Sequence, residues 1–524
     1  MYLFLQPNAS GGRRGWRQTT SPPTARASVL KDLAVQLETW QKDLSPVPII
    51  TGVAPEPKTG TPINVEKVKR IDRKPKSREM IMKSLLGLLF ALTTASAVEK
   101  PATAAKPNIL YILADDMGYA DPGFMGGRDI KTPNLDRLAQ SGAVLKSFYV
   151  QPVCSPTRAS LMTGRYVAHT GVYTIVRPNA AWGLPLAERT LAQALREAGY
   201  TTAITGKWHL GEFQPGYRPT QRGFDHQYGL WFGMIDYFTH MRGDQLDWHR
   251  NDQPCKDEGY STHLLAKEAC RLIRETPAGK PLFLYLPFNA VHTPLQVPDE
   301  YLKPYANLTG QRRTYAGMVA AMDEAIGQVV AALKEKGILD NTLIAFSSDN
   351  GGPSPGKITD NGPLRAGKGT IYEGGIRVCA FATWPGQIPG GKVIDEPLHA
   401  VDWYPTLVKL AGGSLDQKLP LDGLDIWPVL TQGAKSPHDA LLLCGTRRED
   451  VALRMGDWKM VRHANKDELY NLAADLGEAN DLAGQQRDKL TELRAKLDAL
   501  LKTAVASGND SADIKPQKRK QKPK

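Results

Sequence analysis

Apolar runs of strand length alternate with segments of helical periodicity over most of the sequence. Three runs rich in β-branched and aromatic residues have the length of strands: Asn108–Ala114 (NILYILA), Leu282–Pro287 (LFLYLP) and Thr342–Ser347 (TLIAFS). Between them, Leu186–Ala198 and Tyr315–Lys336 are predicted to be helices, the latter with apolar residues at helical spacing. Strands that alternate with amphipathic helices are typical of a mainly parallel sheet. The sequence therefore predicts an α/β fold with a large central sheet flanked by helices.

The pattern changes after Pro437. Leu441–Cys444, Val451–Met455 and Trp458–Val461 resemble short strands, and Asp488–Thr503 has a helical period of Leu and Ala. This pattern predicts a small antiparallel sheet with a C-terminal helix packed on it. The predicted organisation is a large domain over 106–436, a small α+β subdomain over 437–505 and a disordered basic tail over 506–524.

Each predicted strand of the large domain is followed by residues that can take part in chemistry. The sets are Asp115 and Asp116 after the first run, Asn289 and His292 after the second, and Ser348, Asp349 and Asn350 after the third; Lys207 and His209 follow a shorter run in AITGKWHLG. A single polar residue at a strand end is usually a turn former. In open α/β sheets, however, ligands bind beyond the carboxyl ends of the strands. Four such ends together predict one site.

The residue types at these ends indicate what the site binds. Asp115, Asp116, Asp349 and Asn350 supply hard oxygen ligands, which suit Ca²⁺, or less well Mg²⁺, rather than zinc. The two histidines, His209 and His292, lack the third ligand and the close spacing of a zinc site, so we expect them to act as general acid and base. Arg158, Lys207 and Lys368 add positive charge. A divalent cation with three cationic side chains suits a tetrahedral anion, either sulfate or phosphate.

Cys154 lies in the stretch VCSPTRASLMTGR, without a general base beside it in the sequence. The residues alone leave four roles open: nucleophile, metal ligand, half of a disulfide, or a residue that works in another chemical form. The chain has five cysteines, Cys154, Cys255, Cys270, Cys379 and Cys444. Because the number is odd, at least one is free, modified or paired between chains, and a bridge between Cys255 and Cys270 remains open.

The formal net charge of +12 is carried by the two ends of the chain, 1–79 and 511–524, and the stretch between them is neutral. A nucleic-acid enzyme would carry its basic groups on its working surface, so no nucleic-acid partner is expected. From Met82 the sequence MKSLLGLLFALTTASAVEK has the charged start, short apolar run and A-x-A site of a secretory signal peptide. We predict a signal peptide over 80–97 that is cleaved after Ala97, and a non-native extension over 1–79. The mature protein is expected to be periplasmic or secreted, without stable insertion in a membrane.

The segments C-S-P-T-R and A-S-L-M-T-G-R together resemble the C-x-P-x-R-x₄-T-G signature of the type I sulfatases. GYTTAITGKWHLG is similar to the second signature of that family, and the resemblance extends over about residues 107–500, including PNILYILADDMGYADPGFMG, SSDNGG and DELYNLAADLGEANDLA. QPVCSPTRASLMTGRY, PTQRGFDHQYG and GTIYEGGIR look most like the arylsulfatase B branch, the N-acetylgalactosamine-4-sulfatases. The resemblance implies an alkaline-phosphatase-like sandwich and the hydrolysis of sulfate esters on a carbohydrate.

The family resemblance also assigns roles. Cys154 is converted by a formylglycine-generating enzyme to Cα-formylglycine, whose hydrate attacks sulfur. The resemblance implies that calcium is held by Asp115, Asp116, Asp349, Asn350 and residue 154. Asp349 would accept the proton of the nucleophile, and Arg158 would support the hydrated residue 154. Lys207, Lys368 and His292 would bind sulfate, His292 or Lys368 would protonate the leaving oxygen, and His209 would take the proton that releases sulfate.

The substrate is less closely specified by the sequence. His240 and Arg242, in DYFTHMRGD, lie in a region that resembles the sugar pocket of the family and are candidate substrate contacts. One alternative function is a phosphonate or phosphate monoester hydrolase of the same superfamily, since phosphonate monoester hydrolases share C-x-P-x-R. The other is a non-catalytic polyanion-binding protein that uses the basic tail.

Overall fold

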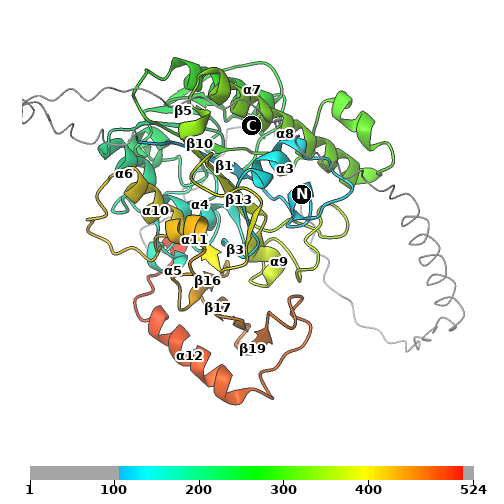
Figure 1. The fold of residues 1–524 in the computed structure, drawn as a ribbon, viewed down its shortest axis with the longest axis vertical. Helices are drawn as coiled ribbons and strands as arrows, with labels where there is room; N and C mark the ends of the chain where they lie inside the picture. Colours follow the sequence, from blue (N-terminus) through cyan, green and yellow to red (C-terminus); the bar gives the residue numbers. More distant parts are fainter. Residues whose placement is uncertain (1–105, 511–524) are drawn as a thin grey trace, which may run out of the picture. The chain divides into compact units, whose positions relative to one another are not determined.

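The computed structural model describes residues 106–510, all of which belong to the second of two compact units, Val98–Lys524. The predicted extension over 1–79, the signal peptide and the tail residues 511–524 lie outside the described residues. Within the described range, the largest sheet has ten strands (Figure 1). Their order is β14 (Lys392–Ile394), β2 (Ala143–Leu145), β13 (Ala380–Thr383), β11 (Thr342–Ser348), β1 (Asn108–Ala114), β10 (Leu282–Pro287), β4 (Thr201–Thr205), β5 (His226–Gly229), β8 (His249–Arg250) and β9 (Gln253–Pro254).

The five central strands β11, β1, β10, β4 and β5 run in parallel, as predicted, with Tyr111 of β1 opposite Tyr285 of β10 and Ala345 of β11. Strand β13 is antiparallel to both β11 and β2, so the sheet is mixed on that side. Every residue of β1 is buried, which explains the unbroken apolar run in the sequence. The prediction of a large, mainly parallel sheet is confirmed.

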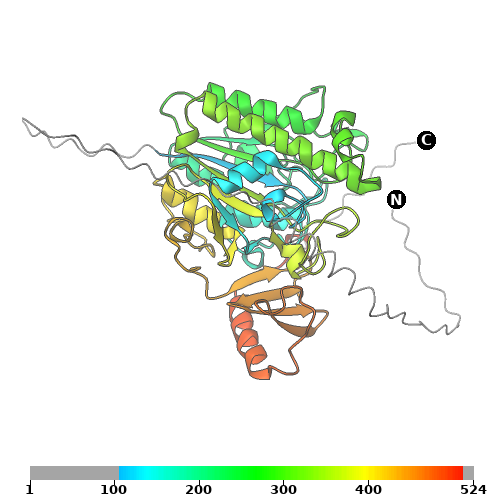
Figure 2. The same cartoon turned by 45° about the vertical axis from the view of Figure 1, so that its right-hand side comes forward.

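Helices cover both faces of this sheet (Figure 2). Leu110 and Ile112 of β1 share one apolar core with α3 (Pro133–Gln140), α7 (Ser261–Glu275) and α8 (Gly310–Glu335). The alternate residues Ile109, Tyr111 and Leu113 share the other core with three helices of the opposite face, α4 (Cys154–Thr163), α6 (Leu191–Glu197) and α10 (Trp403–Leu410). Because successive side chains of a strand point to opposite faces, one short strand supports both layers.

Two predicted helices differ in extent from the observed ones. Helix α6 begins at Leu191 rather than Leu186, because Thr190 and Gln193 form a capping box that fixes its start. Helix α8 begins earlier than predicted, at Gly310, and ends at Glu335, one residue before the predicted end. Among the described residues it alone has the length and apolarity to cross a membrane, yet 67% of its most apolar window is buried, as expected for a core helix.

Within residues 106–510, two further small sheets and three short α-helices precede the C-terminal sheet. A three-stranded sheet is formed by β12 (Arg377–Val378), β3 (Phe148–Tyr149) and β15 (Leu398–His399), and a hairpin by β6 (Met241–Arg242) and β7 (Gln245–Leu246). Short helices are α5 (Val167–Thr170), α9 (Glu373–Ile376) and α11 (Trp427–Gln432).

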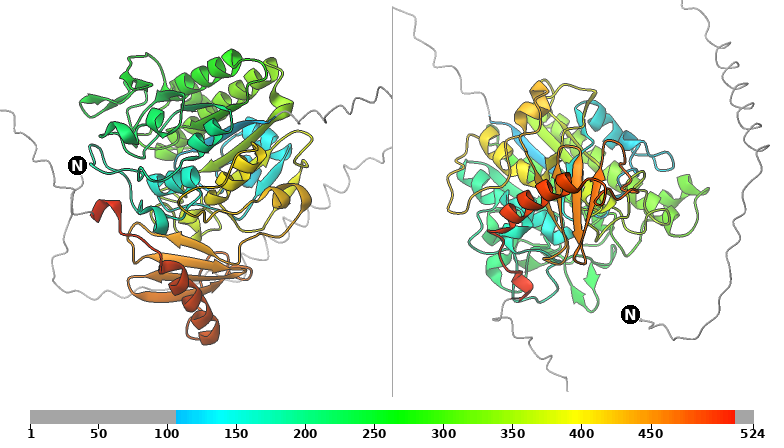
Figure 3. Two further views of the ribbon diagram at one scale, coloured as in Figure 1. Left: turned by 90° about the vertical axis from the view of Figure 1, so that its left-hand side faces the viewer. Right: turned by 90° about the horizontal axis from the view of Figure 1, so that it is seen from below.

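A separate antiparallel sheet follows, with the order β16 (Leu441–Cys444), β17 (Val451–Met455), β18 (Trp458–His463) and β19 (Lys466–Asn471). Helix α12 (Arg487–Leu501) lies across this sheet (Figure 3). Its buried residues Leu490, Leu493 and Leu497 share an apolar cluster with the strands. The small α+β structure was predicted, but β19 was not, because its charged sequence KDELYN lacks an apolar run.

A buried ion cluster joins β18 to α9. Lys459 Nζ lies 2.9 Å from Glu373 Oε1 and 2.8 Å from Glu478 Oε1, and all three side chains are fully buried. Tyr149 donates a hydrogen bond of 2.7 Å to Glu373 Oε2. Two buried carboxylates therefore share one ammonium group, and Glu373 also lies 3.4 Å from Arg377 Nη1.

We predict that Lys459→Met lowers the free energy of unfolding by about 3–5 kcal/mol, because it removes the cation that two buried carboxylates share and leaves Glu478 without a paired cation. Urea denaturation followed by circular dichroism measures the change. Lys466→Met, at a side chain that is 67% exposed, is the control and should leave the unfolding midpoint nearly unchanged. Equal midpoints for the two variants would contradict the prediction.

Candidate active site

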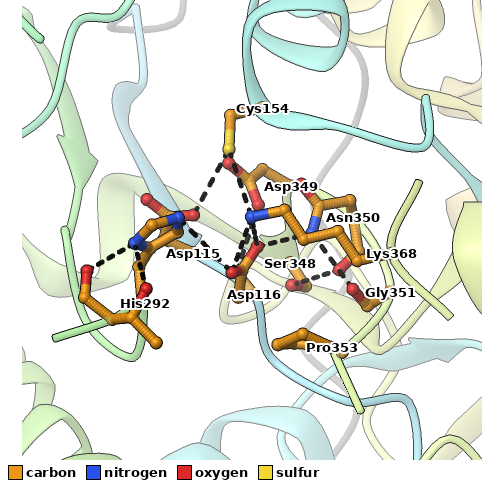
Figure 4. A network of polar contacts seen from close by, with 12 residues as sticks. Asp115, Asp116, Cys154, His292, Ser348, Asp349, Asn350, Gly351, Pro353 and Lys368 are labelled. Atoms are coloured by element: carbon orange, nitrogen blue, oxygen red, sulfur yellow. Dashed lines mark hydrogen bonds and ion pairs between the residues drawn. The ribbon is translucent and has the colours of Figure 1, made fainter. Parts of the chain in front are cut away.

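Most of the predicted site residues come together at the carboxyl edge of the parallel strands. Figure 4 shows the part of this cluster that is formed by Asp115, Asp116, Cys154, His292, Asp349, Asn350 and Lys368. Asp115 and Asp116 follow β1, Asp349 and Asn350 follow β11, and His292 comes after β10. Lys207 and His209 follow β4, while Cys154 and Arg158 enter from the first turns of α4. Asn289, also expected at this edge, instead bonds to Ser261 Oγ at the start of α7, so it supports a helix rather than the site.

Asp115 is fully buried and is surrounded by positive charge. Its carboxylate pairs with Lys207 Nζ and lies 3.6 Å from Arg158 Nη2. Cys154 Sγ is 3.6 Å from Asp115 Oδ1. Burial alone would raise the pKa of Asp115, but Lys207, followed by His292 and Arg158, holds that pKa well below its ordinary value. The group is therefore a permanent carboxylate.

Asp116 pairs with Lys368. The Nζ atom of Lys368 lies 2.6 Å from Asp116 Oδ1 and 2.7 Å from Oδ2, and 3.9 Å from Cys154 Sγ. Burial opposes the charge of Lys368, yet Asp116 and then Cys154 and Asp115 raise its pKa above the ordinary lysine value. Lys368 thus remains a cation and points at the position of Cys154. From the sequence alone, a lysine in such a Gly-rich loop would be expected to be solvated and to have no special role.

Arg158 ties three parts of the site together. Its Nη2 and Nε donate to Asp349 Oδ2 at 2.8 and 3.2 Å, and its Nη1 donates to the backbone oxygen of Lys207 at 2.8 Å. The guanidinium group is completely buried. Burial and the charge of Asp115 raise the pKa of Asp349, against the opposing effect of Arg158. Arg158 thereby orients Asp349 and fixes the turn that carries Lys207.

Cys154 is the first residue of α4 and is only 2% exposed. Burial, followed by Asp115 and Asp349, raises the pKa of its thiol to about 12. A thiol with that pKa is protonated at neutral pH and is a poor nucleophile. All five cysteines lie in the described part and are free, so the bridge between Cys255 and Cys270 that the sequence left open is not formed.

The two catalytic histidine candidates have different surroundings. His209 is buried, and neither ring nitrogen has a hydrogen-bond partner among residues 106–510. Burial, then Lys207 and Arg158, lowers its pKa well below the ordinary value. His292 Nδ1 lies 2.6 Å from the backbone oxygen of Thr293, which can only accept, so Nδ1 carries a hydrogen. His292 Nε2 is then directed to Asp116, with 3.6 Å between Nε2 and Oδ2.

The two candidate substrate contacts lie outside the cluster. His240 is buried, its Nε2 is 3.1 Å from the Gly259 oxygen, and its ring stacks on Trp248 at 4.4 Å. Arg242 places its guanidinium 4.6 Å above the ring of Phe232, which in turn contacts His209. His240 thus packs inside the fold. Its contact with substrate, like that of Arg242, stays a prediction. No signal in the sequence marks Phe232 as part of the site, because only the folded loop brings it to His209.

The donor set fits a hard divalent cation. Ligand atoms of Asp115, Asp116, Cys154 and His292 lie within 4.8 Å of one another. Asn350 donates from Nδ2 to Asp116 Oδ1 at 2.7 Å, while its Oδ1 is buried without a hydrogen-bond partner in the described chain. A buried amide oxygen without a partner is costly unless something accepts its lone pairs. The carboxylates and this oxygen together suit Ca²⁺ or Mg²⁺.

Comparison with known proteins agrees with this chemistry. The family model described as Sulfatase matches residues 107–414. Arylsulfatase J of Mus musculus is 43% identical over 351 residues, which cover 65% of this chain but only 58% of that relative. N-acetylgalactosamine-6-sulfatase of Canis lupus familiaris is 34% identical over 400 residues, covering 71% of this chain and 74% of the relative. The crystal structure of Ps i-CgsB in complex with k-i-k-neocarrahexaose gives a TM-score of 0.72 at 36% identity, covering 77% of this chain and 94% of that one.

The chain therefore belongs to the sulfatase family, the type I sulfuric ester hydrolases. The family resemblance seen in the sequence and the alkaline-phosphatase-like fold that it implied are confirmed. The narrower resemblance to arylsulfatase B stays a prediction.

Proposed function

We propose that this protein is a periplasmic or secreted sulfatase that removes sulfate from a carbohydrate. One observation carries the proposal: a buried, unreactive cysteine lies between Asp115 and Lys368, in a site with two further buried cations, Arg158 and Lys207. The cationic side chains of this site suit the binding of an anion. Because the thiol is protonated, the site needs another nucleophile. Saccharide chemistry is supported by the relatives, one an N-acetylgalactosamine-6-sulfatase and one solved with k-i-k-neocarrahexaose.

Residue 154 is proposed to act as formylglycine, produced by a formylglycine-generating enzyme. The modified residue supplies the nucleophilic oxygen that the protonated thiol lacks. Asp115, Asp116, Asp349 and Asn350, together with residue 154, would hold Ca²⁺, with Mg²⁺ as the alternative. When bound, the cation supplies positive charge that polarises the sulfate group.

The remaining roles belong to the side chains of the chain itself. Lys207, Lys368 and His292 bind the sulfate oxygens, and their charges oppose the negative charge that grows as the ester bond breaks. In its imidazolium form, His292 can donate the proton on Nε2, which is free of the Thr293 contact, to the leaving oxygen; the ammonium group of Lys368 is the alternative donor. His209 accepts a proton on an imidazole nitrogen in the step that releases sulfate; its low pKa keeps the ring neutral and able to accept.

The proposal is tested with enzyme coexpressed with a formylglycine-generating enzyme. Matched aryl sulfate and aryl phosphate esters are compared first, and the sulfate should react faster. A strong preference for phosphate would favour the phosphonate or phosphate monoester hydrolase alternative, and binding without turnover would favour the non-catalytic polyanion-binding one. Saccharides sulfated at position 4 or 6 of N-acetylgalactosamine then test the narrower proposal of a 4-sulfatase.

Sequencing the exported protein from its N-terminus tests the proposed export, and it should give Val98 as the first residue.

We predict that Asn350→Ala weakens calcium binding by at least about tenfold, because it removes a ligand oxygen. Isothermal titration calorimetry measures the dissociation constant directly and does not depend on activity. Asn307→Ala, at an exposed position before α8, is the control. An unchanged dissociation constant for Asn350→Ala would remove this residue from the ligand set.

A further inference from the structure

His209 lacks the hydrogen bonds that usually orient a catalytic imidazole. Both ring nitrogens are buried without a partner in the described chain, and the residue has a left-handed backbone conformation, with φ of 57°. Its backbone is fixed, since His209 N donates to the Trp231 oxygen at 2.9 Å. The orientation of the ring must therefore come from packing, and the packing partner is the chain that follows β5.

Two consecutive residues of that chain, Phe232 and Gly233, press against the imidazole. The Phe232 and His209 rings are in a T-shaped arrangement, with 5.2 Å between their centroids and an interplanar angle of 76°. A Cβ atom on Gly233 would lie 2.5 Å from Cε1 and 2.8 Å from Nε2 of His209. No side chain can occupy that space unless the imidazole moves. Gly233 has no left-handed φ, so the restriction is one of space and not of backbone conformation.

The hairpin region beyond β5 holds these two residues in place. Asp247 is buried, and its Oδ1 and Oδ2 accept the backbone N–H groups of Trp231 and Phe232 at 3.1 and 3.0 Å. The guanidinium carbon of Arg242, on β6, lies over the Phe232 ring, 4.6 Å from its centroid. These contacts form a continuous path from the hairpin to the imidazole, in which each member limits the motion of the next.

We propose that Phe232 and Gly233, held by Asp247, are positioning residues that fix the orientation of the His209 imidazole. The proposal rests on the proposed function in one respect, that His209 accepts a proton during turnover. An imidazole without hydrogen bonds can rotate about two side-chain torsions, and proton transfer requires one particular nitrogen at hydrogen-bond distance. A displacement of about 1 Å at such a group can cost on the order of 10²-fold in rate.

The test is Gly233→Ala in full-length enzyme, with Gly484→Ala as the matched control, because a Cβ at Gly484 would meet nothing within 4 Å. We expect kcat of Gly233→Ala to fall by about 10²-fold with little change in KM, and the control to remain at the parent rate. In a His209→Ala background, Gly233→Ala should cost almost nothing further, since its effect passes through that ring.

A spectroscopic measurement makes the test independent of turnover. In protein labelled with ¹³C-histidine, the Cε1–H resonance of His209 is identified by its loss in His209→Ala, and it should shift in Gly233→Ala but not in Gly484→Ala. Phe232→Leu, which removes the aromatic edge but not the glycine, should shift the same resonance and covers the case in which Gly233→Ala does not fold. An unmoved resonance in both variants, or an equal loss of rate with and without His209, would overturn the proposal. Absence of sulfatase activity in the parent enzyme would refute the proposed function and leave this resonance test intact.

Discussion

Replacement of Cys154 by alanine should abolish sulfate ester hydrolysis and leave the fold intact. We expect a loss of kcat on the order of 10⁶-fold, the size seen when a covalent nucleophile is removed. The reason is that, among residues 106–510, the candidate for the attacking group is residue 154, whose sulfur lies 3.9 Å from Lys368 Nζ and 3.6 Å from Asp115 Oδ1. Hydrolysis of an aryl sulfate, with circular dichroism as the check on folding, measures the effect.

Cys444→Ala is the matched control for this prediction. Cys444 is also buried, and burial raises the pKa of its thiol to about 12 as well, but it lies on β16 in the small sheet. That variant should keep the parent rate. Mass spectrometry of the parent peptide that contains residue 154 should show a loss of about 18 Da, the change from CH₂SH to CHO. Full activity with an unmodified thiol, or survival of activity in Cys154→Ala, would refute the mechanism.

Lys368→Ala should lower kcat by about 10²–10³-fold, the usual cost of removing one group that stabilises charge in the transition state. Lys368 remains charged because Asp116 raises its pKa, and it is aimed at the position of Cys154. We expect the loss to appear mainly in kcat, since the negative charge on the leaving oxygen is greatest in the transition state. Steady-state kinetics on an aryl sulfate separate kcat from KM.

Lys357→Ala serves as the control for Lys368, because Lys357 is exposed in the same connection between β11 and α9. Its replacement should change neither constant. A Lys368→Ala enzyme with the parent kcat would exclude this lysine from transition-state stabilisation. If Lys207→Ala also kept the parent kcat, neither lysine could be part of the proposed anion site.

The strands of the central sheet could be predicted because they are buried on both faces. In such strands nearly every position is apolar, and β1 is recognisable in the sequence as Asn108 followed by the six-residue apolar run Ile109–Ala114. Prediction failed for β19, whose outer residues are charged, and for the start of α6, which depends on the capping box at Thr190. In these two cases local hydrogen bonds and sheet pairing, rather than hydrophobic periodicity, set the outcome.

The site residues were predicted for a related reason. Asp115, Asp116, Asp349 and Asn350 stand directly after strands, and parallel strands bring their carboxyl ends to one edge, so sequence position implies proximity. Asn289 shows the limit of this argument: it also follows a strand, but its side chain turns to Ser261.

By itself, the sequence determined the class of fold, the family signature around Cys154 and the set of oxygen donors, since each of these is written in a short stretch of the chain. Only the tertiary structure decided which lysine pairs with which carboxylate, that the Cys154 thiol is buried and protonated, and that Gly233 leaves room for His209. The physical reason is that charge pairing, desolvation and steric exclusion depend on distances between residues far apart in the sequence. Those distances exist only after the sheet, its helices and the loop after β5 have packed together.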